Sequence, residues 1–297
     1  MKVVVKRLSS LSEASRSRMY FCMNVGHLRL CLASEPMELT TSWERVFDAN
    51  LRRRYEFAEV RNAAATLKAT NPDAFDHLTK VLTGFALSLD DLVVPGGNKG
   101  AVAKRLDQTF RELGWREAGH ETKTTVTFTL RPYRGAGETK AIVRAAETES
   151  RGHKVDNVLG RAALDVEWNA KDGNLDRDLS NFSALHEYAL IDAGVVLTRH
   201  QQRTKWAANT LAEMANRILY DDDGKRVILL STTTTTNFEQ LLWRLKRGDG
   251  RGCPILAIAV TELSYRPAPG EPELPSYGGP IEIPEGVPDE PEEEPEA

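Results

Sequence analysis

The stretch that decides the fold runs through residues 153–182 and reads HKVDNVLGRAALDVEWNAKDGNLDRDLSNF. Successive side chains of an extended strand point to opposite faces of a sheet. In a strand predicted at about 161–168, Asp165 and Glu167 therefore share one face. The apolar residues beside them point the other way, into the core: Leu164, Val166 and Trp168.

A third carboxylate precedes this strand. Asp156 lies nine residues before Asp165, and Gly160-Arg161 between them predicts a turn. Two strand segments joined in this way fold back on each other and bring Asp156, Asp165 and Glu167 together. Clustered carboxylates repel one another unless a divalent cation neutralises them, and hard oxygen ligands with some retained water suit Mg²⁺.

The flanking chain alternates between helical and strand periodicity. Thr41 and Glu44 form a capping-box pattern, which predicts a long helix through LRRRYEFAEVRNAAATLK at 51–68. The GGNKG segment at 96–100 predicts a loop. Helices are also predicted at 72–84, 101–113, 175–189, 206–218 and 237–247, and strands at 122–130, 193–198, 227–231 and 255–260.

The strand predicted at 122–130, TKTTVTFTL, places Val126, Phe128 and Leu130 on one face with threonines opposite, which is typical of a half-buried strand. Helices come first along the chain, and strands alternating with helices follow. This order indicates an α/β fold, a mixed central sheet flanked by helices with a helical N-terminal part. We expect one domain over 41–265, with an N-terminal extension at 1–40.

Composition excludes several protein classes. No run of about 18 apolar residues occurs, so no membrane span is expected. The three cysteines, Cys22, Cys31 and Cys253, form no CxxC pair and no even framework, which indicates reduced thiols in a cytoplasmic protein.

The net charge of −4 conceals an uneven distribution. Residues 267–297 hold ten acidic residues, no Lys or Arg, and nine of the fourteen prolines. The rest of the chain has 39 basic and 43 − 10 = 33 acidic residues, a charge of +6. A basic body suits a polyanion ligand, and residues 266–297 are expected to be a disordered tail that either solubilises the protein or covers a basic cleft.

Several strings resemble the Bgl II-type (BamHI/BglII-like) branch of type II restriction endonucleases, within the PD-(D/E)XK nuclease superfamily. They span about residues 50–262 in the family's order: EFAEVRNAAATLK, PGGNKG, GWREA, HKVD, ALDVEWNAKD, LDRDLSNF, IDAGVVLTR and TTTTTNFEQLLWRLKRGDGRGCPILAIAV. The resemblance implies a Mg²⁺-dependent endonuclease that cuts both strands of a short palindromic DNA site as a homodimer and leaves 5′-phosphate ends.

The resemblance also assigns roles by position. Asp156 would be a metal ligand, Asp165 the second acidic position, and the Val166 backbone carbonyl a further ligand. Glu167 would occupy the position of the motif's lysine. Two departures are that Asp165 is one methylene shorter than the Glu more usual in this branch, and that Glu167 carries no positive charge.

Residues near the deciding stretch are candidate DNA contacts. Lys154 precedes Asp156 and suits either a phosphate contact or a surface turn, and Asn169 and Lys171 follow the catalytic strand. Arg and Gln are the residue types that read guanine and adenine edges. The polar cluster at 199–203 is therefore a candidate recognition loop as well as a candidate solvated turn, with Arg199, Gln202 and Arg203 as its contacts.

Two other functions stay open. A protein of this fold could bind DNA with weakened catalysis or cut only modified DNA, and a nuclease of the same superfamily could act in repair or on RNA. Incubating unmodified DNA with Mg²⁺ separates them, because only a site-specific endonuclease gives discrete bands.

Overall fold

A six-stranded mixed sheet forms the centre of the protein. The computed structural model describes residues 37–93, 99–171, 173–232 and 234–279, and the backbone of 19–25 and 28–34. The strand order is β3-β10-β9-β8-β7-β4, in which β8, β9 and β10 run parallel and the other pairs are antiparallel. The strands are β3 (Tyr55–Val60), β4 (Arg116–Ala118), β7 (Val155–Leu159), β8 (Ala162–Val166), β9 (Ala193–Arg199) and β10 (Ile255–Val260).

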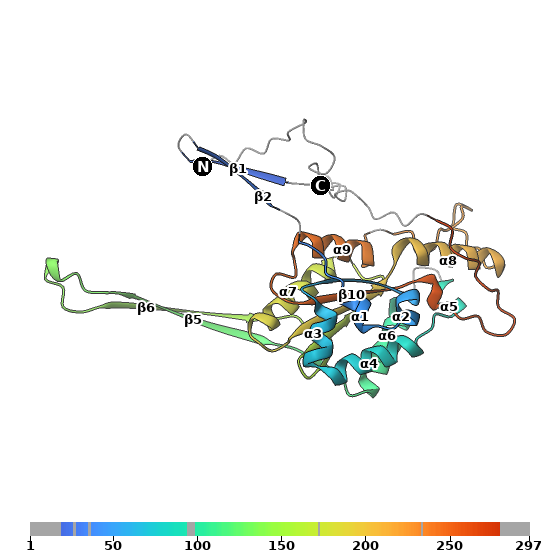
Figure 1. The fold of residues 1–297 in the computed structure, drawn as a ribbon, viewed down its shortest axis with the longest axis horizontal. Coiled ribbons are helices and arrows are strands. Elements are labelled where there is room, and N and C mark those ends of the chain that lie inside the picture. Colours follow the sequence, from blue (N-terminus) through green and yellow to red (C-terminus); the bar gives the residue numbers. More distant parts are fainter. Residues whose placement is uncertain are drawn as a thin grey trace.

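Helices cover both faces of this sheet (Figure 1). Against one face pack α3 (Ala63–Thr70), α4 (Pro72–Gly84), α6 (Lys99–Glu112) and α8 (Gln201–Met214), and against the other pack α7 (Gly173–Glu187) and α9 (Phe238–Arg247). Three short helices complete the body: α1 (Trp43–Val46), α2 (Ala49–Arg54) and α5 (Leu89–Leu92). The predicted α/β class is confirmed, because the central strands are buried on both sides, as parallel strands require.

The helix predicted through 51–68 is wrong, because its middle is strand β3. Phe57 lies opposite Ile258 of β10, and this pairing extends the sheet by one antiparallel strand. The fully buried Glu59 of β3 accepts hydrogen bonds from Ser42 Oγ at 3.0 Å and from the Ala64 amide at 2.7 Å. The predicted capping box of Thr41 and Glu44 is also absent. Ser42, not Thr41, is the residue before α1, and its hydroxyl bonds with Glu59 and the Ala65 amide instead of capping the helix.

Two other predicted boundaries also differ. Residues 227–231 form no strand, since the backbone of Leu229 bonds with the side chain of Asn209 instead of with a neighbouring strand. Helix α8 ends at Met214, four residues before the predicted end. The predicted loop at 96–100 lies mostly outside the described residues.

Strands β5 (Glu121–Leu130) and β6 (Ile142–Arg151) form a separate two-stranded ribbon that projects from the body (Figure 1). The prediction of a half-buried strand is wrong here. Val126 is 57% exposed and Phe128 55%, because no other described element covers either face of the ribbon. We call this ribbon, residues 121–151, the arm.

The described part of the C-terminal segment packs on the body without forming a helix or strand. The Tyr277 ring lies 5.1 Å from the Trp206 ring of α8, and Leu274 packs against the main core. The chain therefore stays in contact with the body beyond the predicted boundary at 265/266. Residues 280–297, which hold most of the tail's acidic groups, lie outside the described residues. At the other end, β1 (Met19–Val25) and β2 (Leu28–Ser34) pair antiparallel.

Candidate active site

Strands β7 and β8 bring two of the predicted carboxylates side by side. They form an antiparallel pair in which Asn157 lies opposite Leu164, and a two-residue turn joins them. Gly160 in that turn has φ +58°, a backbone conformation that favours glycine. The Asp156 amide donates a 2.7 Å hydrogen bond to Asp165 Oδ1. The predicted turn and the predicted proximity of Asp156 and Asp165 are therefore confirmed.

Glu167 extends this site beyond the end of β8. Its amide donates to the Leu197 carbonyl of β9 at 2.9 Å, which keeps the chain extended past Val166. Asp165 and Glu167 are 2% and 4% exposed, while the alternate residues join the main core as predicted: Leu164, Val166 and Trp168. The alternation of the two faces is confirmed.

Helix α7 contributes two residues that the sequence analysis did not assign. Arg177 Nη2 lies 3.1 Å from Asp178 Oδ1 and 3.8 Å from Glu167 Oε1. Asp178 is 1% exposed. One signal could have identified it, since Asp178 lies three residues after Leu175 and four before Phe182, on the apolar face of the helix. A carboxylate in that position needs a partner.

The buried carboxylates hold protons more tightly than usual. Burial, together with the charge of Asp178 and a hydrogen bond with it, raises the pKa of Glu167 from 4.5 to about 9. Burial and the charge of Asp178 raise the pKa of Asp165 well above its usual value, and burial raises those of Asp156 and Asp178 as well. Arg177 opposes each of these shifts without cancelling them. One guanidinium is therefore too little to keep all four carboxyl groups ionised, and without a further cation the site favours their protonated forms.

Unsatisfied oxygen atoms mark where another positive charge would be accommodated. Apart from a proton that Glu167 and Asp178 can share, no donor in the described chain reaches Asp165 Oδ2, Glu167 Oε2 or Asp178 Oδ2. However, no set of three or more His, Cys, Asp or Glu side chains among these same residues is arranged to hold a metal ion. The expectation that three carboxylates converge on one ion therefore stays a prediction. A pair of carboxylates still fits Mg²⁺, which usually keeps several waters and takes one or two protein carboxylates.

The candidate DNA contacts nearest this site are only partly free. Lys154 is exposed but forms a 2.6 Å ion pair with Glu117 of β4. Asn169 has φ +53° and accepts a 2.6 Å hydrogen bond from Arg199, and Lys171 is exposed. Asn157, beside Asp156, donates to Asp107 of α6 at 2.8 Å, a contact that was not predicted.

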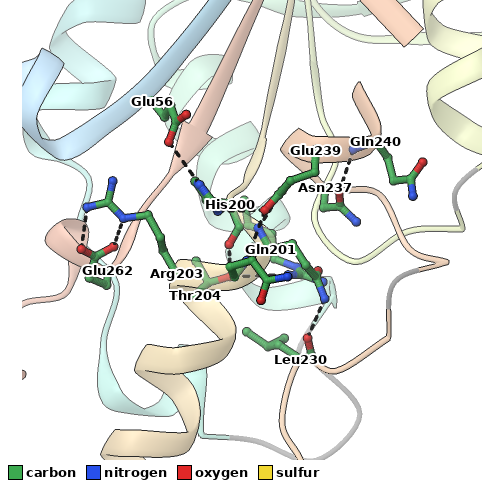
Figure 2. Close-up of polar contacts among 12 residues, drawn as sticks. Glu56, His200, Gln201, Arg203, Thr204, Leu230, Asn237, Glu239, Gln240 and Glu262 are labelled. Atoms are coloured by element: carbon green, nitrogen blue, oxygen red, sulfur yellow. Dashed lines mark hydrogen bonds and ion pairs between the residues drawn. The ribbon is translucent and has the colours of Figure 1, made fainter. Parts of the chain in front are cut away.

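The predicted recognition loop at 199–203 is wrong, because these residues end β9 and begin α8 (Figure 2). Arg199 is fully buried and donates to Asn169, Thr204 and Thr235. Arg203 makes two 2.6 Å hydrogen bonds with Glu262, as Figure 2 shows. Of the three predicted contacts in this cluster, Gln202 alone is exposed.

His200 joins three elements at the centre of Figure 2. Its Nδ1 lies 2.9 Å from Glu239 of α9, and its Nε2 lies 3.2 Å from Glu56 of β3. Despite burial, these carboxylates raise the pKa of His200 from 6.5 to about 9. His200 therefore acts as a charged crosslink between β3, β9 and α9 at neutral pH.

This crosslink predicts a pH-dependent loss of stability in His200→Gln. A raised histidine pKa stabilises the fold fully below 6.5, and that contribution disappears as the pH rises through 9. The variant should therefore unfold ~2 kcal/mol more easily than wild type at pH 6, with the difference shrinking toward pH 10. Urea denaturation at several pH values measures it. A difference that does not change with pH would show that the ion pairs contribute nothing.

Comparison with known protein families agrees with this geometry. A family model described as restriction endonuclease BglII/BglIII matches residues 55–260, from the first strand of the six-stranded sheet to its last. No match was found among curated proteins. None of the helices in the described regions is long and apolar enough to cross a membrane. The matched region covers more than half of the chain and contains the four carboxylates of the site, Asp156, Asp165, Glu167 and Asp178. The chain therefore belongs to the BglII/BglIII family of restriction endonucleases and is a site-specific deoxyribonuclease.

Proposed function

We propose that this protein hydrolyses phosphodiester bonds at a short palindromic duplex site, with Mg²⁺ and as a homodimer, leaving 5′-phosphate ends. One observation carries the proposal. Asp156 and Asp165 lie on adjacent antiparallel strands, joined by a 2.7 Å hydrogen bond, and Asp165 Oδ2 is buried with no hydrogen-bond partner among the described residues. Family membership supports DNA cleavage, and this carboxylate pair supports the metal.

Asp156, Asp165 and the Val166 backbone carbonyl would hold the metal. When bound, a divalent cation would supply positive charge to the phosphorane oxygens and lower the pKa of a coordinated water. Asp165 is held by the Asp156 amide, so its unpaired oxygen keeps a fixed position. Asp156 is only half-buried, which suits a residue that must reach the DNA phosphate.

Glu167 and Asp178 would share and release a proton in this site. Neither Glu167 Oε2 nor Asp178 Oδ2 has a partner donor in the described chain, and a proton held by Glu167 would join the two carboxyl groups. After deprotonation Glu167 could orient or deprotonate the attacking water. Arg177 lies 3.8 Å from Glu167 and supplies a positive charge beside the position where the superfamily motif has lysine.

Three exposed or half-buried residues remain as DNA contacts near the site: Lys154, Asn169 and Lys171. Gln202 is exposed at the start of α8 and stays a candidate for base recognition. Arg199 and Arg203 are no longer candidates for base recognition, because their guanidinium groups bond to other residues of the protein.

Digestion of a plasmid of known sequence tests the proposal. With Mg²⁺ we expect discrete fragments whose sequenced ends share one palindromic site and ligate without phosphorylation. EDTA should prevent cutting, and sedimentation of the free protein should give the mass of a dimer. Binding without fragments would favour a catalytically weakened DNA-binding protein, and fragments with random ends would favour a nuclease without site specificity.

A further inference from the structure

We propose that the arm is a second DNA-binding element, which contacts the phosphate backbone of the bound DNA at a distance from the active site. The inference rests on the proposed function, because it takes the DNA at Asp156 as its reference point. The arm leaves the sheet next to that site: β4 precedes it, β7 follows it, and Arg151 at the end of β6 lies five residues before Asp156. Figure 1 shows the arm extending far beyond the body.

The length of the arm matches the dimensions of duplex DNA. Each strand has ten residues, which at ~3.3 Å per residue gives a ribbon about 33 Å long. One turn of duplex is about 34–36 Å. If a phosphate of the DNA lies at Asp156, the arm would therefore lie beside about one further turn of the duplex.

The two faces of the arm differ in charge. Directly paired residues share a face, so the register separates the side chains into two sets. One face, which we call the Phe128 face, contains no carboxylate and consists of Thr122, Thr124, Val126, Phe128, Leu130, Ile142, Arg144, Ala146, Thr148 and Ser150. The opposite face contains all the acidic residues of the two strands: Glu121, Glu147 and Glu149. Hydroxyl groups and arginine are side chains that commonly bind DNA phosphates.

Charge also differs along the arm. At its base the cations are paired, with Lys123 3.0 Å from Glu147 and Arg151 3.4 Å from Glu121. The outer part holds Glu138 and four cations, a net charge of 4 − 1 = +3. In the described chain none of these four forms an ion pair: Arg131, Arg134, Lys140 and Arg144. The unpaired cations therefore lie where the arm is farthest from the body.

This charge pattern favours DNA over a second copy of the chain. The exposed apolar side chains of the Phe128 face, Val126, Phe128 and Leu130, need a partner, because an isolated two-stranded ribbon is marginally stable in water. If two Phe128 faces packed together, each would bury an Arg144 guanidinium with no carboxylate on either face to pair with it. DNA satisfies both requirements, since it offers phosphates to the cations and base edges and methyl groups to the apolar side chains.

Two double variants with equal charge loss test the proposal. Arg131→Ala/Arg144→Ala removes two unpaired outer cations, and Lys123→Ala/Arg151→Ala removes two paired cations from the base. The measurement is the affinity of the full chain for a 30-base-pair mixed-sequence duplex in EDTA, where no cutting occurs, over a range of salt concentrations. The outer variant should bind about tenfold or more weakly and lower the slope of log K against log salt by about 1.8. The base variant should keep the wild-type slope.

The other outcomes overturn the proposal. Equal losses in both variants would mean that only the overall charge matters, and unchanged binding by the outer variant would remove the arm from the DNA interface. If Phe128→Ser/Leu130→Ser lowers the sedimentation mass while the outer variant keeps the wild-type slope, the arm docks on a second copy of the chain. If the wild-type protein cuts DNA and the outer variant binds DNA normally, the proposal for the arm is rejected but the proposed function is not. Wild-type protein that binds no duplex would reject the proposed function too.

Discussion

Asp156→Ala should leave a folded protein that still binds DNA and cuts it ~10³-fold or more slowly. The side chain would hold the metal with Asp165, and metal stabilisation of the transition state is worth several kcal/mol, at 1.36 kcal/mol for each tenfold. The substitution keeps the backbone amide that positions Asp165, and Asp156 is only half-buried, so the fold should not change.

The measurement is initial cleavage rate with Mg²⁺ on a substrate whose site has been mapped, with duplex affinity measured in EDTA. Asp76→Ala is the matched control, because Asp76 is exposed on α4 and takes no part in the site. It should cut at the wild-type rate. Full cleavage by Asp156→Ala in Mg²⁺ would refute the assignment of the catalytic carboxylates.

Glu167→Gln should stabilise the metal-free protein and slow cleavage. The pKa of Glu167 is about 9 in the folded protein, against 4.5 ordinarily, so ionising it opposes folding. This destabilisation is absent below pH 4.5, grows as the pH rises, and is complete above 9. The neutral glutamine avoids it. We expect ~3 kcal/mol of extra stability at pH 8 to 9, a rise in Tm of about 6–12 °C, and no difference near pH 4.5.

Thermal denaturation in EDTA across this pH range measures the effect. Glu147→Gln on the exposed arm is the control, because it removes the same charge from a site in water and should leave Tm unchanged. A variant that is no more stable than wild type at pH 8 would show that Glu167 is already ionised without cost in the native protein. The cleavage rate of Glu167→Gln then separates its part in catalysis from its effect on stability.

The parts predicted correctly depend on local patterns. The alternation around Asp165 and the glycine turn at 160 define β7, β8 and the pairing of their carboxylates without any distant contact. Most of the helices were predicted for the same reason. Their apolar residues recur at helical spacing, and α4 and α9 begin after Asn71 and Asn237.

The parts predicted wrongly depend on distant contacts. Residues 55–60 contain good helix formers, and only pairing with β10, about 200 residues later, makes them a strand. The arm has the alternation of a half-buried strand, but the pattern does not show whether anything covers the apolar face. Arg199, His200 and Gln201 of the polar cluster at 199–203 are buried. Their surroundings include Glu56, Glu239 and Glu262, which meet the cluster from separate elements that the local pattern does not reveal.

The position of β10 has a consequence for synthesis of the protein in the cell. This strand is the last of the six-stranded sheet to leave the ribosome, and it lies between β3 and β9 near the middle of the finished sheet. A nascent chain that ends before Ile255 has no strand to connect β3 with the half that carries the carboxylates. The central sheet therefore cannot close until Ile255–Val260 has been synthesised.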